Sequence, residues 1–130
     1  MNVLVAYSGT KESKAALTYA RRQAAVWGAT LFIVSSSEGG KGEKPEEISR
    51  MAAELEDIKA ALEKEGIPCT VEQLARGFSP GEDILLYADE NEIDHIVVGI
   101  RKKSRTSKLI LGSTAQYIIL KAKCPVTSVK

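Results

Sequence analysis

The chain has 130 residues, of which 44% are apolar and 27% are charged, and its formal net charge at pH 7 is +1. This size is typical of a single domain, residues 1–130, that buries its core without a metal or a disulfide. The balanced charge argues against a nucleic-acid partner. Because no run is long and apolar enough to span a membrane and no signal peptide is evident, we expect a cytoplasmic protein with no membrane partner.

The N-terminal part predicts a strand, a helix and a second strand. Two short apolar runs, at 3–7 and 30–34, are typical of strands that are covered on both faces of a sheet. Between them, apolar residues recur at helical spacing and predict a helix from Lys11 to Trp27. Thr10 is a suitable N-cap for this helix, and Gly28 permits the positive φ with which many helices end.

The middle of the chain predicts a loop, a helix and an edge strand. The loop at 35–44 is rich in Ser, Gly and Lys. Pro45 suits the first turn of the next helix, and Gly66 is expected to end it. The strand at 68–75 is less apolar on one side, which favours a place at the edge of the sheet.

The C-terminal part adds two helices and two strands. Ser79 and Glu82 form a capping box around a proline, which is a specific signal for the start of a helix. The segment 94–98, which is apolar from Ile96 onward, predicts the fourth strand. Ser113, with a Gln three residues later, predicts a second capping box, and 124–129 predicts the last strand.

The cysteines and the histidine do not suggest a metal site. Cys69 and Cys124 stand apart, without a Cys-x-x-Cys pair, and His95 is the single histidine. A zinc site is therefore not expected. We expect the cysteines to be reduced, small apolar side chains, and His95 to be a structural residue of its strand.

The alternation of strands and helices predicts an α/β fold. Such a chain forms a mostly parallel sheet with right-handed crossovers and helices on both faces. The ligand of such a fold lies beyond the carboxyl ends of the strands, at a topological switch point. Three segments fall at such ends: the turn at 7–10, the residues 34–35 and the segment that follows Val98.

The segment from Gly99 to Thr114 is the strongest candidate for a binding site. A Gly-Ser step at Gly112 and Ser113 opens a helix, whose first N–H groups have no intrahelical partner and whose dipole attracts anions. Five cations lie in the same segment: Arg101, Lys102, Lys103, Arg105 and Lys108. We expect a phosphate-bearing small molecule at this turn, and a solvated surface loop is the alternative interpretation of the cations.

These residues together resemble the universal stress protein family. The family pattern Gly-x2-Gly-x9-Gly-(Ser/Thr) is kept in spacing from Gly99 to Ser113, with Lys102 in place of its second Gly. The opening run 4–10 and the closing corner 122–126 are also similar to the family's, so the resemblance covers essentially the whole chain.

The resemblance has implications for fold and assembly. It implies a Rossmann-like fold of the adenine nucleotide alpha hydrolase-like type: a three-layer sandwich with a five-stranded parallel sheet of order 3-2-1-4-5. It also implies a homodimer, formed through the fifth strand, Cys124–Val129, and leaves any further protein partner unknown. Some members of the family bind ATP, and others do not.

Carried over residue by residue, the resemblance implies a nucleotide site. Val34 would meet the adenine, the turn after the first strand would contact the ribose or a phosphate, and the segment after the fourth strand would hold the phosphates. The implied nucleotide-binding residues are Ala6, Ser8, Gly9, Thr10, Val34, Val98, Gly99, Lys102, Gly112, Ser113 and Thr114. Two of them depart from the family: Ser8 replaces an Asp that helps to hold the nucleotide, and Lys102 replaces a Gly that lets backbone approach phosphate closely.

Three functional hypotheses result. The first is a dimer that binds an adenine nucleotide, ATP, as a stress sensor or regulator. The second is a dimeric interaction module that binds no nucleotide because Lys102 fills the pocket. The third is an ATP-hydrolysing enzyme, for which the sequence shows no evident general base; because Ser8 also removes the best candidate ligand for Mg²⁺, turnover should be slow.

Overall fold

The computed structural model describes residues 1–40, 42–102 and 109–130. Five parallel strands form one sheet in the order β3-β2-β1-β4-β7, and two short strands form an antiparallel hairpin. The elements in chain order are β1 (Asn2–Ala6), α1 (Lys11–Trp27), β2 (Thr30–Ser36), α2 (Pro45–Lys64), β3 (Cys69–Leu74), α3 (Pro80–Glu90), β4 (His95–Gly99), β5 (Arg101–Lys102), β6 (Leu109–Ile110), α4 (Ser113–Lys121) and β7 (Val126–Val129).

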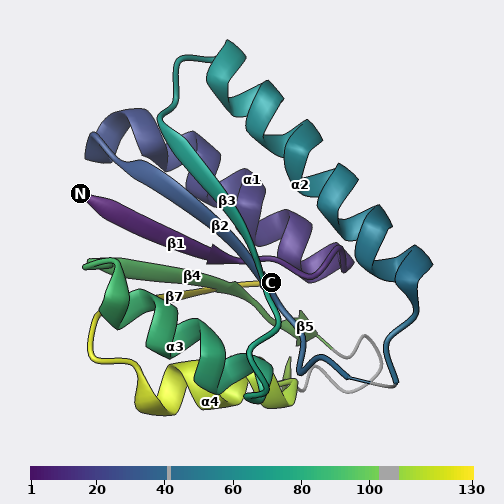
Figure 1. The fold of residues 1–130 in the computed structure, drawn as a ribbon. Coiled ribbons are helices and arrows are strands. Elements are labelled where there is room, and N and C mark those ends of the chain that lie inside the picture. The colour runs from purple at the N-terminus through teal and green to yellow at the C-terminus, as the bar shows by residue number, and fades with distance from the viewer. Residues whose placement is uncertain (41, 103–108) are drawn as a thin grey trace.

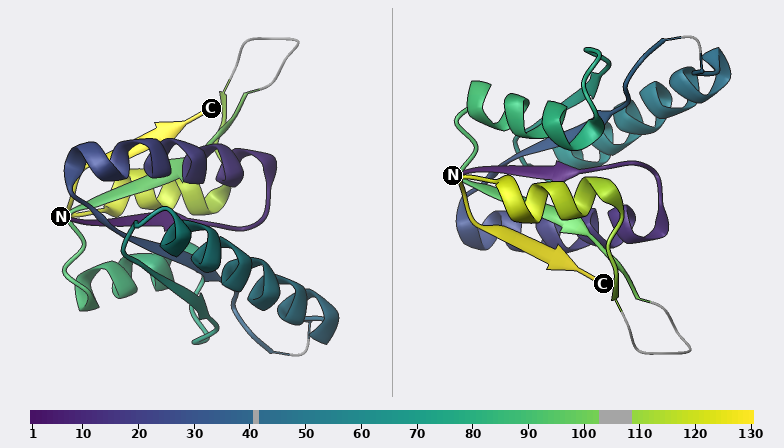
Figure 2. Two further views of the ribbon diagram at one scale, coloured as in Figure 1. Left: turned by 90° about the horizontal axis from the view of Figure 1, so that it is seen from above. Right: turned by 90° about the horizontal axis from the view of Figure 1, so that it is seen from below.

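The sheet is the middle layer of a three-layer sandwich. Helices α1 and α2 cover one face, and α3 and α4 cover the other (Figures 1 and 2). Successive residues of β1 alternate between two cores, since Val3 and Val5 pack on the side of α1 and α2, whereas Leu4 and Ala6 pack on the side of α3 and α4. The predicted α/β sandwich with sheet order 3-2-1-4-5 is therefore confirmed, with β7 as its fifth strand.

Strand β1 lies at the centre of the sheet and marks its switch point. It pairs with β2 on one side and with β4 on the other. The connection after β1 leads through α1 to β2, whereas the connection after β4 leads to the other side of the sheet through α4 (Figure 1). The two loops diverge, which leaves room for a ligand at the carboxyl ends of β1 and β4.

The helix termini agree with the predictions in part. Thr10 caps α1 by accepting a hydrogen bond from the Ser13 backbone N–H, and Gly28 ends α1 in the left-handed region at φ 61°. Ser79 is the N-cap of α3 as predicted, but its hydroxyl donates to the Glu82 carboxylate at 2.9 Å instead of capping the backbone.

The expectation that Ser113 caps the last helix is wrong. Gly112 occupies the N-cap position of α4, and Ser113 is the first helical residue. In the described part of the chain, no side chain forms a cap hydrogen bond at this terminus. The cap lies one residue before the predicted position because a Gly can replace Ser at an N-cap with little loss of stability.

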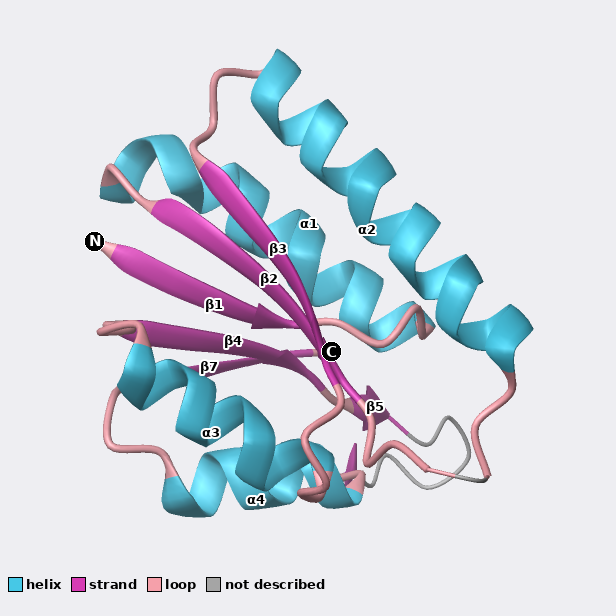
Figure 3. Cartoon of the chain, viewed as in Figure 1, coloured by secondary structure: helices cyan, strands magenta, loops and turns pink. Residues whose placement is uncertain are grey.

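The edges of the sheet and the β5–β6 hairpin differ slightly from expectation. Strand β3 lies at one edge as predicted, and β7 lies at the other but begins at Val126 instead of Cys124. The hairpin lies in a segment that was expected to be a loop, and it is separate from the main sheet (Figure 3). The predicted cations Lys103, Arg105 and Lys108 lie outside the described residues, as does the side chain of Lys102.

His95 and the cysteines occupy structural positions. The Nε2 atom of His95 lies 2.6 Å from the hydroxyl of Thr127 on β7, and its ring stacks on Trp27 with centroids 5.2 Å apart. Burial lowers the pKa of His95. Both Cys69 and Cys124 are free, half-buried thiols.

Among the helices that the structure describes, none has the length and apolar character needed to cross a membrane.

Candidate functional site

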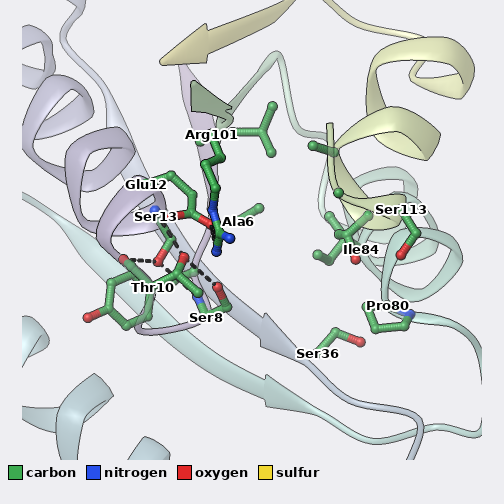
Figure 4. A pocket seen from close by; sticks show the side chains of 16 residues that line it. Ala6, Ser8, Thr10, Glu12, Ser13, Ser36, Pro80, Ile84, Arg101 and Ser113 are labelled. Carbon is green, nitrogen blue, oxygen red and sulfur yellow. Dashed lines mark hydrogen bonds and ion pairs between the residues drawn. The ribbon is translucent and has the colours of Figure 1, made fainter. Parts of the chain in front are cut away.

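A cavity of about 480 Å³ opens at the carboxyl ends of β1 and β4, within the usual size range of small-molecule sites. Its walls come from the turn after β1, the first turn of α1, the end of β2 and the first turns of α3 and α4 (Figure 4). Most of the predicted site residues line it, namely Ala6, Ser8, Thr10, Val98, Gly99, Gly112, Ser113 and Thr114.

Of the predicted site residues whose side chains or Cα positions the structure describes, two do not line the cavity, and the side chain of Lys102 lies outside the described residues. Val34 is fully buried, and its carbonyl accepts a hydrogen bond from the Tyr7 backbone N–H at 2.8 Å. Gly9 has φ 77°, and a Cβ built on it would lie 3.1 Å from the Glu54 carboxylate, on the side of α2. At the end of β2 the cavity is lined instead by Ser36, which the sequence analysis did not select.

The turn after β1 is held by a compact set of hydrogen bonds. The Ser8 and Thr10 hydroxyl oxygens lie 3.0 Å apart, and the Ser8 backbone N–H donates to the Ser13 hydroxyl at 3.2 Å. The Ser13 hydroxyl donates in turn to the Thr10 carbonyl at 3.0 Å. These bonds place the two hydroxyls at the cavity wall (Figure 4), where they offer both donors and acceptors to a ligand.

Tyr7 is a buried residue at the base of the same turn. It is 4% exposed. Burial, together with the neighbouring Glu54 carboxylate, raises the pKa of Tyr7 to about 12. The phenol is therefore protonated at neutral pH and supplies no charge to the cavity.

Gly99 has a packing role at the wall of the cavity. A Cβ at this position would overlap the backbone carbonyl of Glu12 and lie 2.9 Å from the backbone N of Ser13. The first turn of α1 therefore rests directly on the end of β4. A glycine at this place lets the strand and the helix approach closely enough to form the adjacent cavity wall.

The N-terminus of α4 is the terminus at the cavity that is most open to an anion. Helix α1 is capped by Thr10, and the first turn of α3 contains two acidic residues, whereas α4 has neither a side-chain cap nor an acidic residue in its first turn. The first backbone N–H groups of a helix lack intrahelical partners and carry partial positive charge. Because Ser113, Thr114 and Ala115 all line the cavity, an anion is the natural ligand at this end.

One ion pair lies at the rim of the cavity. The guanidinium of Arg101 is 3.5 Å from the Glu12 carboxylate, and the side chains are 66% and 23% exposed. Among the described lining residues these two carry the formal charges. A pair this exposed contributes little to stability, so a ligand phosphate can compete with Glu12 for Arg101 at small cost.

A buried charge cluster supports the opposite part of the cavity. Asp83 on α3 is fully buried and binds Arg76 through an ion pair of 2.6 Å. Arg76 also contacts Glu90 at 2.7 Å. The second carboxylate oxygen of Asp83 accepts a hydrogen bond from the Ser36 hydroxyl at 3.3 Å.

The sequence did contain a signal for this cluster. Asp83 precedes the buried Ile84 and stands one helical turn before the buried Tyr87, so it shares the inward face of α3. A carboxylate on such a face requires a partner.

Within the part of the chain that the structure describes, no group of three or more acidic, Cys or His side chains could hold a metal ion.

Comparisons with known proteins agree with this architecture. Residues 1–130 match the sequence model of the Universal stress protein family. A universal stress protein from Thermus aquaticus is 32% identical over 134 residues, which cover 98% of this chain and 97% of the relative. A solved universal stress protein from Archaeoglobus fulgidus is 37% identical, has a TM-score of 0.87, and covers 100% of this chain and 98% of its own.

A second solved structure from Archaeoglobus fulgidus contains a ligand. It is a universal stress protein in complex with dAMP, is 30% identical to this chain, and has a TM-score of 0.79. The match covers 100% of this chain and 98% of that protein.

Proposed function

This chain belongs to the universal stress protein family, and we propose that its cavity binds an adenine nucleotide. The observation that carries the proposal is the uncapped, acid-free N-terminus of α4, which faces a cavity at the switch point of the sheet. The complex of a relative with dAMP supports the choice of an adenine nucleotide.

The distribution of charge in the cavity supports one orientation of the bound nucleotide. The phosphate lies against the backbone N–H groups of Ser113 and Thr114, with Arg101 released from Glu12 to contact it. The sugar lies near the hydroxyls of Ser8 and Thr10. The base extends toward the end of β2 and α3, where Pro80 and Ile84 supply apolar surface.

The nucleotide binds without a metal held by the protein. Among the described lining residues, Glu12 is the one that carries a carboxylate. This carboxylate is already paired with Arg101, which would compete with a metal ion for it. Mg²⁺ prefers several oxygen ligands in octahedral geometry, which a single paired carboxylate does not provide. Any Mg²⁺ would therefore accompany ATP on its phosphates.

Calorimetric titration with AMP and with ATP, each with and without Mg²⁺, tests the proposal. A Ser113→Glu variant places a carboxylate at the phosphate position and should abolish binding by charge repulsion. A Gln116→Glu variant adds the same charge to an exposed residue of α4 outside the cavity and should bind normally. No heat with either nucleotide at millimolar concentration would refute the proposal.

The Lys102 alternative is tested in the same assay. If Lys102→Gly creates nucleotide binding that the parent protein lacks, the interaction-module hypothesis is correct. If the parent binds and Lys102→Ala weakens the affinity, the lysine is a phosphate ligand instead.

We also propose that the protein forms a homodimer through β7 and acts as a nucleotide-dependent regulator. Strand β7 is an edge strand in the described sheet, and exposed edges favour pairing with a second strand. On the side of β7 that faces β4, the Pro125 carbonyl accepts a hydrogen bond from the Ile96 backbone N–H. The Val129 carbonyl accepts one from the Ile100 backbone N–H on the same side. By the alternation of a strand, the backbone groups of Val126 and Ser128 point to the open edge, where a second copy can pair.

A further inference from the structure

Among the residues that the structure describes, Asp83 is the one charged side chain that is fully buried. It is linked to the cavity wall by its hydrogen bond with the hydroxyl of Ser36. It has no exposed surface, whereas Ser36, its hydrogen-bond partner, is half-buried and lines the cavity. Figure 4 shows Ser36 beside Pro80, apart from Arg101 and Glu12. A buried carboxylate in this position can determine whether the Ser36 hydroxyl donates or accepts a hydrogen bond when a ligand binds.

The hydrogen bonds of Asp83 define the polarity of the Ser36 hydroxyl. One carboxylate oxygen accepts from Arg76 Nε at 2.6 Å, and the other accepts from Ser36 Oγ at 3.3 Å. A carboxylate only accepts, so the Ser36 proton points to Asp83. The hydroxyl has a single proton and two lone pairs, so toward the cavity Ser36 presents only an acceptor.

Reversal of this hydroxyl is costly. If Ser36 turned its proton toward a ligand, one oxygen of the buried Asp83 would lose its hydrogen-bond donor. An unsatisfied buried acceptor is strongly unfavourable, and more so when it is charged. Arg76 cannot replace the lost donor easily, because its remaining nitrogens contact Glu90 at 2.7 Å and the Asp83 carbonyl at 3.3 Å.

We propose that Ser36, oriented by Asp83 and Arg76, selects a base that carries an amino group at this end of the cavity, and so favours adenine over a 6-oxopurine. This inference rests on the proposed binding of a nucleotide with its base toward β2. The amino group of adenine donates a hydrogen bond to Ser36 Oγ. The 6-oxo oxygen of hypoxanthine at the same place would instead face a lone pair of Ser36 Oγ. Both atoms are acceptors, so no hydrogen bond forms between them.

The test compares AMP with IMP by calorimetric titration. The two bases differ in the 6-substituent and at N1, which accepts a hydrogen bond in adenine and donates one in hypoxanthine, so the Ser36 variants isolate the effect of the 6-position. The parent protein should bind AMP about tenfold more tightly than IMP, because the 6-oxo group leaves a buried polar contact unpaired. Ser36→Ala removes the acceptor and should bring the two affinities to within about twofold. Ser35→Ala changes the adjacent serine of β2, which does not line the cavity, and should keep the preference.

Asp83→Asn provides a sharper variant. Arg76 Nε only donates, so the amide oxygen of Asn must face it, and the amide nitrogen then donates to Ser36 Oγ. The Ser36 proton is thereby released toward the cavity, and the preference should shift toward IMP by about tenfold or more relative to the parent protein. Should this variant not fold, the Ser36→Ala and Ser35→Ala pair still decides the matter.

The outcomes separate this inference from the proposed function. Equal affinity of the parent protein for AMP and IMP would overturn the selection by Ser36 and leave nucleotide binding intact. A preference for AMP that Ser36→Ala keeps would also overturn it. Binding of neither nucleotide would overturn the proposed function, and the inference with it.

Discussion

Substitution of Gly99 by Ala tests whether the first turn of α1 rests on the end of β4. The added Cβ would overlap the Glu12 carbonyl and lie 2.9 Å from the backbone N of Ser13. Both contacts are backbone atoms, which cannot rotate away as the end of a side chain can. Overpacking of this kind typically costs 1–3 kcal/mol, and because backbone must move here we expect a loss of about 2–3 kcal/mol.

Thermal and urea unfolding measure this loss. For a domain of this size the change corresponds to a decrease in Tm of about 10 °C. Gly42→Ala is the matched control, because among the described residues other than its chain neighbours no atom lies within 4 Å of its Cβ, and its φ is outside the left-handed region. That variant should stay within about 0.5 kcal/mol of the parent protein. If Gly99→Ala unfolded as the control does, the close approach of α1 to β4 would be refuted.

Three further predictions concern the rim of the cavity, the tyrosine at its base and the sheet edge. Arg101→Gln should weaken AMP binding about three- to tenfold, and Glu12→Gln should strengthen it about threefold by removing the competing carboxylate, as calorimetry can measure; equal effects of the same sign would contradict the competition. Because the pKa of Tyr7 is raised to about 12 in the fold, the unfolded chain loses this proton first. Stability should therefore fall by about 2 kcal/mol between pH 10 and 12. Urea titrations at several pH values should show a smaller fall for Tyr7→Phe. Ser128→Pro should convert the proposed dimer to a monomer in light scattering without loss of the fold, since the Ser128 N–H points away from β4; a monomeric parent protein, or a dimer that persists in the variant, would contradict pairing through this edge.

Much of the fold follows from local patterns in the sequence. The apolar runs of β1 and β2 are read correctly because both faces of those strands are covered, so nearly every residue is apolar. Thr10 and Gly28 mark the ends of α1 through conformations that few other residues adopt as readily. The order of the strands came from the resemblance to a family, because no local pattern determines which strands pair.

The candidate site was predicted less completely, for a physical reason. The segment from Gly112 to Thr114 could be predicted because a Gly-Ser step that opens a helix is a local feature of the sequence, although the capping box expected at Ser113 does not form. Asp83 and Ser36 were missed because their contact joins residues 47 positions apart in sequence. Ser36 alone reads as an ordinary polar residue, and the place of Asp83 on the inward face of α3 indicates burial without identifying its partners. Glu12 was missed in the same way, since its relation to Arg101 exists only once α1 lies on the end of β4.

The most direct test of nucleotide binding at α4 is the change in backbone amide NMR shifts when AMP is added to the protein. We predict that the largest changes fall on Ser113, Thr114 and Ala115, because their N–H groups would contact the phosphate, and that the changes saturate with AMP concentration. Shifts that remain unchanged at millimolar AMP, or that fall on residues outside the cavity, would contradict the proposed site.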